Sequence, residues 1–399
     1  MHDALDPRRE ADLARLGELL PNAGRHAWKG TLFTPARLAN FKLSYEEEAR
    51  GATVLESYPW KLTVEPSNLC NLRCPACFTG VGEAGRMRSH MSMELFEKAL
   101  DELGPTLIQL ELLNWGEPLL AKNIFPMLEL AQRARVSTTI FTNFSVPFDE
   151  ERAERLVASG LALLAVSADG ARQETYEKYR VRGNFALVVK NCRLVAEAKK
   201  RLGSSTPAML WDFHVFEHNV DDLPDAARMA ADLGMLFGRN KGWVVGPEWE
   251  TDKARFFMDP HPGRCHFLWH QGVINNDGGV APCCGTFYEE DDLGRLAVSP
   301  EDLGAASFRE IWNGERFQAA RRLYQARSGP AGIEKTICYH CPVTKLWERW
   351  QAHQAAGGTL ETLDVGSTNE NFNFFWEFRK EPRPVPVALR RKAPRAGSL

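Results

Sequence analysis

A regular alternation of short strand-like runs and longer helical runs, starting near residue 61, constrains the fold most. Such alternation predicts a parallel sheet with crossover helices. Six strands are expected, over residues 61–65, 107–113, 137–142, 161–167, 209–216 and 243–245. Five helices are expected, over residues 93–103, 124–135, 150–159, 185–202 and 222–233. This count predicts an α/β fold, a partial (β/α)6 TIM-like barrel whose reactive groups gather at the C-terminal ends of its strands.

Polar residues recur at alternate positions of three expected strands, so those of one strand share a face. They are Thr63 and Glu65 in the first strand, Gln109 and Glu111 in the second, and Asp212 and His214 in the fifth. Because the apolar residues between them should face the helices, we expect these polar groups to line the barrel interior around a polar ligand. The alternative is that they satisfy one another or bound water.

Composition excludes several classes of protein. The net charge of −3 gives no general attraction to nucleic acid or to an anionic membrane. No apolar run approaches the roughly 20 residues of a membrane span, and the N-terminus lacks the apolar stretch of a signal peptide. We therefore expect a cytoplasmic protein without a membrane span. In a reducing compartment, the clustered spacing of eight of the nine cysteines, all but Cys192, favours metal or cluster ligation over disulfides.

The chain is long enough for more than one domain. Residues 1–58 are expected to form a helical extension and residues 59–250 the barrel. After about residue 250 the alternation stops, and residues 251–348 are expected to form a smaller cysteine-bearing domain. Residues 349–399 form a C-terminal extension with a basic tail that is expected to be disordered.

Three cysteines follow the first expected strand with the spacing C-x3-C-x2-C, at Cys70, Cys74 and Cys77. Three thiolates on one short loop can hold three irons of a [4Fe–4S] cube and leave the fourth iron open for a ligand. A zinc site is the alternative, but zinc needs a fourth ligand and usually shows two C-x-x-C pairs.

Further motifs follow the strands in order. They are Trp115-Gly116-Glu117-Pro118, Thr142-Asn143, Ser167-Ala168-Asp169-Gly170 and Arg180. With the cysteine triplet, they make the chain resemble the radical S-adenosylmethionine (SAM) superfamily, in the branch with a C-terminal SPASM or twitch domain. This resemblance implies that the chain reductively cleaves SAM to a 5′-deoxyadenosyl radical, which abstracts hydrogen from a substrate.

The resemblance also implies which residues meet SAM. Gly116 and Glu117 would receive the SAM ammonium, although Trp115 stands where the family has a glycine. Ser167 and Arg180 would meet its carboxylate and ribose, since a guanidinium binds a carboxylate in a fork. Asn143 completes the expected SAM-binding set. Ala76 stands where the family often has an aromatic residue, so adenine contact there would run mostly through backbone.

Five of the remaining cysteines lie near the C-terminus. The resemblance implies that Cys265, Cys283, Cys338 and Cys341 hold one auxiliary [4Fe–4S] cluster, because five cysteines are too few for two more clusters. A zinc site with four thiolates stays open on spacing alone. Cys192 lies on an apolar helix face and is expected to be a buried core thiol.

Three residues are candidates for catalysis. Asp212 and Glu111 are candidate proton acceptors, since a carboxylate in a closed site can be tuned for that task. Cys284 could replace Cys283 as a ligand, donate hydrogen to a substrate radical, or only pack.

The sequence favours a radical SAM oxidoreductase that dehydrogenates or epimerises a small polar molecule, such as a sugar, aminocyclitol or nucleoside. A flavodoxin-type reductase is the expected electron donor. The alternative is a peptide-modifying enzyme acting on a precursor peptide; residues 1–60 look too short and too helical for the leader-binding domain that many such enzymes carry. A non-enzymatic electron carrier is a third possibility, which the open-iron triplet disfavours. No basic stripe points to nucleic acid.

Overall fold

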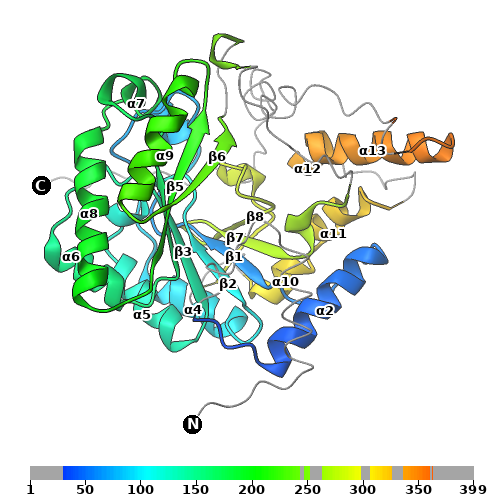
Figure 1. Ribbon diagram of the computed structural model, residues 1–399. Helices are drawn as coiled ribbons and strands as arrows, with labels where there is room; N and C mark the ends of the chain where they lie inside the picture. The colour runs from blue at the N-terminus through cyan, green and yellow to red at the C-terminus, as the bar shows by residue number, and fades with distance from the viewer. Residues whose placement is uncertain are drawn as a thin grey trace, which may run out of the picture.

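A computed structural model describes residues 30–242, 247–251, 263–297, 306–325, 336–359 and 362 of the chain. Six consecutive parallel strands carry helices on their outer side (Figure 1). These strands are β1 (Lys61–Val64), β2 (Gln109–Leu112), β3 (Ser137–Thr142), β4 (Leu163–Ser167), β5 (Ala208–Val215) and β6 (Leu236–Lys241). The fold is the predicted partial TIM-like barrel.

Helices connect and flank these strands. Between the strands lie α3 (Phe78–Val81), α4 (Met93–Leu103), α5 (Ile124–Arg133), α6 (Glu150–Ala158), α7 (Gln173–Tyr179), α8 (Phe185–Arg201) and α9 (Leu223–Asp232). Before and after the strands lie α2 (Pro35–Ala49), α10 (Phe308–Trp312), α11 (Glu315–Arg322), α12 (Ile337–His340) and α13 (Pro342–Ala355). All five predicted helices are present, with ends within two residues of the prediction.

The described strands form one sheet in the order β6-β5-β4-β3-β2-β1-β7-β8-β9. Strand β7 (Gln271–Ile274) pairs in parallel with β1, and β8 (Gly279–Ala281) and β9 (Gly294–Arg295) follow in antiparallel order. The first strand of the C-terminal cysteine region is therefore hydrogen-bonded directly to the first barrel strand, so the two regions share a sheet.

Helix α4 illustrates how local sequence places the barrel helices. The Ser92 hydroxyl caps its N-terminus by accepting a hydrogen bond from Leu95 N, which satisfies one of the helix's free donors. Leu95, Phe96 and Leu103 lie on one face and are buried against the sheet. The 3.6-residue periodicity of apolar residues thus fixes which side of the helix covers the strands.

One predicted strand was misplaced. Residues 243–245, where the sixth strand was expected, lie outside the described residues, and the sixth strand of the sheet is β6 at Leu236–Lys241. The sequence of β6 is short of apolar alternation because it contains Gly238, Arg239 and Asn240. It pairs only with β5 among the described strands, so it is an edge strand and tolerates polar residues.

Other expectations fall outside the described residues, namely residues 1–29 of the N-terminal extension and the basic C-terminal tail. No described helix has the length and apolar character needed to cross a membrane.

Candidate functional site

The loop that follows β1 carries the three N-terminal cysteines. Its backbone is held at Arg73, whose N–H donates to Val181 O at 3.0 Å, and at Cys77, whose N–H donates to Cys74 O at 3.3 Å. Gly80 lies so close to this loop that a β-carbon would stand 2.3 Å from Cys74 O. The loop therefore folds tightly over the start of α3 and brings its three thiols together.

The three thiols are largely shielded from water and lie near charged side chains. Burial, together with the neighbouring Glu117, Cys74 and Cys77 charges, raises the pKa of Cys70 to about 12. Burial likewise raises the pKa of Cys74 to about 11, against the opposing effect of Arg180. Three thiolates here need a positive partner to be stable, and an iron–sulfur cluster supplies one. The residues present fit the open-iron cluster.

Glu117 lies at the C-terminal ends of β2 and β3, next to the cysteine loop. Its carboxylate accepts hydrogen bonds from Thr142 Oγ1 at 2.6 Å, from Asn143 N at 2.8 Å and from Leu119 N at 3.0 Å. Burial raises the pKa of Glu117, and these donors and Arg180 oppose that rise. The predicted Glu117 and Asn143 are thus brought together beside Cys70, whose Sγ lies 3.7 Å from Asn143 Nδ2.

Trp115, the first residue of this motif, stands where the family has a glycine, and its side chain makes structural contacts. Its indole Nε1 donates to Thr286 O at 2.8 Å, and its ring packs 5.1 Å from Phe78 and 5.5 Å from Phe287. Trp115 therefore joins the cysteine loop to the C-terminal region. Gly116 keeps the close backbone approach, since a β-carbon there would lie 1.9 Å from Ser67 O.

Ser167 is the last residue of β4, and Arg180 follows the last residue of α7. The Arg180 guanidinium donates to Asp169 Oδ2 at 2.5 Å and lies 3.4 Å from His214 Nδ1. Asp169 is fully buried, and Arg180 and His214 overcome the effect of burial and hold its pKa down at about 2. Ser167 pairs in register with Asp212. The guanidinium is therefore ion-paired beside Cys74, and it is fixed in orientation toward the cysteine loop.

A second site is a cavity lined by Cys265, Cys283, Cys338 and Cys341, together with apolar side chains and Tyr324. Burial raises the pKa of all four thiols. Among the described residues, no group of three or more His, Cys, Asp or Glu side chains is arranged to hold a single metal ion. Four cysteines around a shared cavity fit a larger iron–sulfur cluster better than the zinc alternative.

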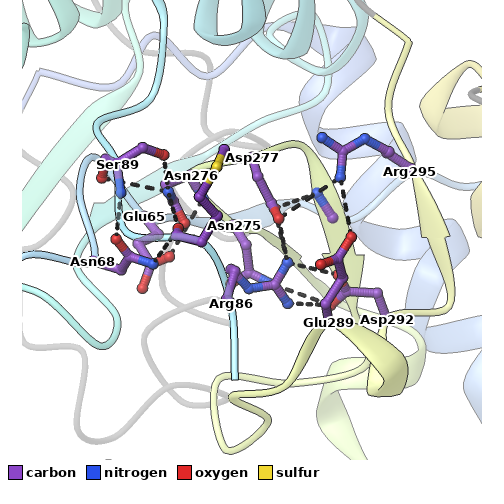
Figure 2. Close-up of polar contacts among 12 residues, drawn as sticks. Glu65, Asn68, Arg86, Ser89, Asn275, Asn276, Asp277, Glu289, Asp292 and Arg295 are labelled. Atoms are coloured by element: carbon purple, nitrogen blue, oxygen red, sulfur yellow. Dashed lines mark hydrogen bonds and ion pairs between the residues drawn. The ribbon is translucent and has the colours of Figure 1, made fainter. Parts of the chain in front are cut away.

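A buried charge network ties the barrel to the C-terminal region (Figure 2). Arg86 donates to Asp277 Oδ1 at 2.8 Å and to Asp292 Oδ1 at 2.7 Å, and all three side chains are buried. Glu65, at the end of β1, accepts from Trp115 N at 3.0 Å and from Asn276 N at 3.4 Å. The spacing between the two cysteine sites is thus supported by paired charges.

The three candidate catalytic residues fall into two groups. Glu111 pairs with Lys61 at 2.8 Å, and these two charges also act on the pKa of Cys284. Asp212 lies apart from them, accepting from Asn240 Nδ2 at 2.6 Å. Burial raises the pKa of Cys284 to about 11, and Cys284 is absent from the lining of the cavity that the other four C-terminal cysteines share.

Cys192 is fully buried in the main core, as predicted.

Sequence reasoning missed the roles of Lys61, Asp169 and Arg86. It also missed Gln271, whose amide donates to Thr63 Oγ1 at 2.8 Å and to Glu111 Oε2 at 3.3 Å. Alternation on the first strand could have drawn attention to Lys61, which is two residues before Thr63 and shares its face. Asp169 stands inside a motif that was noted only for its serine. No local signal marks Gln271 or Arg86, because their partners are distant in sequence.

Residues 64–226 match the family model of the radical SAM superfamily, and residues 265–342 match that of an iron–sulfur cluster-binding domain, SPASM. The chain belongs to the radical SAM superfamily. As a radical SAM enzyme with a SPASM domain, it binds SAM at a [4Fe–4S] cluster and has a domain for auxiliary iron–sulfur binding, as the resemblance implied.

Curated relatives of this radical SAM enzyme include mycofactocin maturase MftC of Mycobacterium ulcerans, 29% identical over 44% of this chain and 45% of the relative. The sporulation killing factor maturation protein SkfB of Bacillus subtilis is 25% identical over 50% of this chain and 47% of the relative. A probable GTP 3′,8-cyclase of Methanocaldococcus jannaschii is 26% identical over 44% of this chain and 56% of the relative. The chain spans about half the length of these relatives.

Among solved structures, Streptococcus suis SuiB bound to SAM matches with a TM-score of 0.55 and 15% identity, over 84% of each chain. SuiB bound to the precursor peptide SuiA matches with a TM-score of 0.53, 15% identity and the same coverage. These likenesses establish a shared fold.

Proposed function

We propose that this radical SAM enzyme matures a peptide by removing a hydrogen atom from one of its residues. The observation that carries the proposal is that two of its curated relatives are a maturase and a maturation protein, while SuiB, of similar fold, binds a precursor peptide. This support favours the peptide alternative over the small-molecule substrate that the sequence suggested first.

In this proposal Cys70, Cys74 and Cys77 hold the cluster that binds SAM, and the C-terminal set of Cys265, Cys283, Cys338 and Cys341 holds the auxiliary cluster. Bound together, the first cluster and SAM supply the 5′-deoxyadenosyl radical. Gly116 supports the proposed role of the motif by letting the backbone approach the cysteine loop closely. Ser167 and Arg180 lie on the same side, at the ends of β4 and α7. Electrons come from a flavodoxin-type donor.

A small polar substrate is the second candidate, and the polar inner face of β1 and β2 favours it. Dehydrogenation and epimerisation could then be distinguished by their products. One oxidised product per 5′-deoxyadenosine indicates dehydrogenation, and an isomeric product with solvent deuterium at carbon indicates epimerisation.

The experiment uses the anaerobically reconstituted holoenzyme with SAM, a chemical reductant and the synthetic peptide encoded beside the gene. We expect a modified peptide, and we expect deuterium placed at the reacting carbon to appear in 5′-deoxyadenosine. An unchanged peptide, together with conversion of a sugar or an aminocyclitol under the same conditions, overturns the peptide proposal in favour of the second candidate.

A further inference from the structure

Polar side chains gather on one face of three neighbouring strands in the centre of the sheet. The register of β1 with β2 and β7 places Lys61, Gln109 and Gln271 side by side, with Thr63 and Glu111 one step further along. The intervening Leu62 and Leu110 point the other way and are fully buried in the core under the helices. The polar set therefore faces the barrel interior.

Glu111 is the centre of this set. Its Oε1 accepts from Lys61 at 2.8 Å and from Gln109 Nε2 at 3.5 Å, and its Oε2 accepts from Thr63 at 3.2 Å and from Gln271 at 3.3 Å. Four donors occupy the four acceptor positions of a carboxylate. Glu111 is thus better placed to orient its neighbours than to take up a proton.

Two members of this set are partly exposed although their strands are central, while Thr63, Gln109 and Gln271 are buried. The Lys61 and Glu111 side chains keep 21% and 13% of their exposure, while Leu62 and Leu110 on the opposite face keep at most 1%. This partial exposure means that protein atoms leave room beside the Lys61 and Glu111 side chains. Lys61 retains protons for further hydrogen bonds into that space.

An independent observation comes from the next strand. Thr139 of β3 pairs in register with Glu111, so it lies on the same face. Its hydroxyl is buried, and among the described residues it has no hydrogen-bond partner. A buried hydroxyl without a partner is costly, so its presence points to a bound group that completes it.

The charges of this set indicate what it binds. Lys61 and Glu111 neutralise each other, so the set offers no free charge for a phosphate or a carboxylate. Of its remaining groups, the Lys61 ammonium donates hydrogen bonds, while the Gln271 amide and the Thr139 hydroxyl can both donate and accept them. The Lys61 and Glu111 charges act on the pKa of Cys284, next to Cys283 of the auxiliary cavity, so the set lies within electrostatic range of the C-terminal cysteine site.

We propose that Lys61, Glu111, Gln271 and Thr139 form a subsite for an uncharged amide of the substrate, either a backbone peptide group or an Asn or Gln side chain. This subsite rests on the proposed function, because it supposes a peptide substrate. It fixes the reacting residue between the SAM site, at the C-terminal ends of the strands, and the auxiliary cysteines.

The test compares Thr139→Val, which removes the hydroxyl, with Thr139→Ser, which keeps it, in the reconstituted holoenzyme. Thr138→Val is the matched control, since Thr138 is buried on the opposite face of the same strand. Binding of the synthetic peptide encoded beside the gene is measured by calorimetry. We expect Thr139→Val to weaken binding about five-fold, the effect of one hydrogen bond, with unchanged iron content.

Thr139→Ser and Thr138→Val should bind as the wild type does. Equal binding by Thr139→Val and the wild type means that water completes Thr139, and it overturns the subsite while leaving the peptide proposal intact. Failure of the wild type to bind the peptide overturns the proposed function instead. Peptides with each Asn and Gln replaced in turn separate the two sources: loss of the Thr139→Val effect in one of them identifies a side-chain amide, and its persistence in all identifies a backbone amide.

Discussion

Substituting Gly116 by alanine tests whether the motif after β2 supports the cysteine loop. A β-carbon at this position would lie 1.9 Å from Ser67 O, 2.7 Å from Ser67 C and 2.8 Å from Asn68 Cα, all of them backbone atoms. Relief to about 3.0 Å requires a displacement of about 1.1 Å in the segment that leads directly into Cys70. Overpacking of this kind costs about 1–3 kcal/mol, and here it moves a proposed cluster ligand.

The assay is iron content and 5′-deoxyadenosine formation after anaerobic reconstitution. We expect Gly116→Ala to lose about four of about eight irons and to stop cleaving SAM, while the auxiliary cluster persists. Gly82→Ala is the control, because a β-carbon at Gly82, also close to the cysteine loop, meets nothing within 4 Å and only the backbone angle is strained. Full iron content and wild-type SAM cleavage in Gly116→Ala would refute the reasoning.

Three further predictions use the same holoenzyme. Cys284→Ala should keep about eight irons, whereas Cys341→Ala should keep about four, because Cys341 lines the shared cavity and Cys284 does not. Iron loss in Cys284→Ala would make Cys284 a ligand. Arg86→Met should lower stability by about 3–5 kcal/mol in a thermal melt, since it leaves the buried Asp292 without its cation and Asp277 with only the more distant Arg295 at 3.7 Å; an unchanged melting temperature would contradict this. Burial lowers the pKa of His214, but the Asp169 and Asp212 charges outweigh burial and raise it. The stability that the His214 charge contributes is therefore complete below about pH 6.5, and it is lost as pH rises through the raised pKa. His214→Gln should therefore lower the melting temperature more near pH 6 than near pH 9, and an equal or reversed difference counts against that ion pair.

Much of the fold could be predicted because its signals are local. The helices α4 and α8 carry apolar residues at helical spacing and begin at Ser92 and Asn184, whose side chains cap them. The prediction placed the sixth strand too late in the chain, because β6 is an edge strand with glycine and polar residues and lacks the alternation of apolar and polar residues that marks a strand. Local pattern thus identifies the regular barrel strands and helices, and it misses the edge strand β6 and the short buried strand β7.

The candidate site divides in the same way. The cysteine triplet and the Gly116-Glu117 motif are contiguous in sequence, so they could be found there. The pairing of Lys61 with Gln271 across β1 and β7 joins residues about two hundred positions apart, and no local pattern encodes it. The same holds for Arg86 with Asp292. Long-range strand order and buried ion pairs are consequences of the packed fold, and they appear only once the fold is known.

The central claim is that one chain holds a SAM-cleaving cluster and a separate auxiliary cluster. The most direct measurement is iron content and SAM cleavage in the wild type and in a variant with Cys70, Cys74 and Cys77 all changed to alanine. The account predicts about eight irons with 5′-deoxyadenosine in the wild type, and about four irons with no 5′-deoxyadenosine in the variant. About four irons in the wild type, or SAM cleavage that survives in the variant, would contradict it.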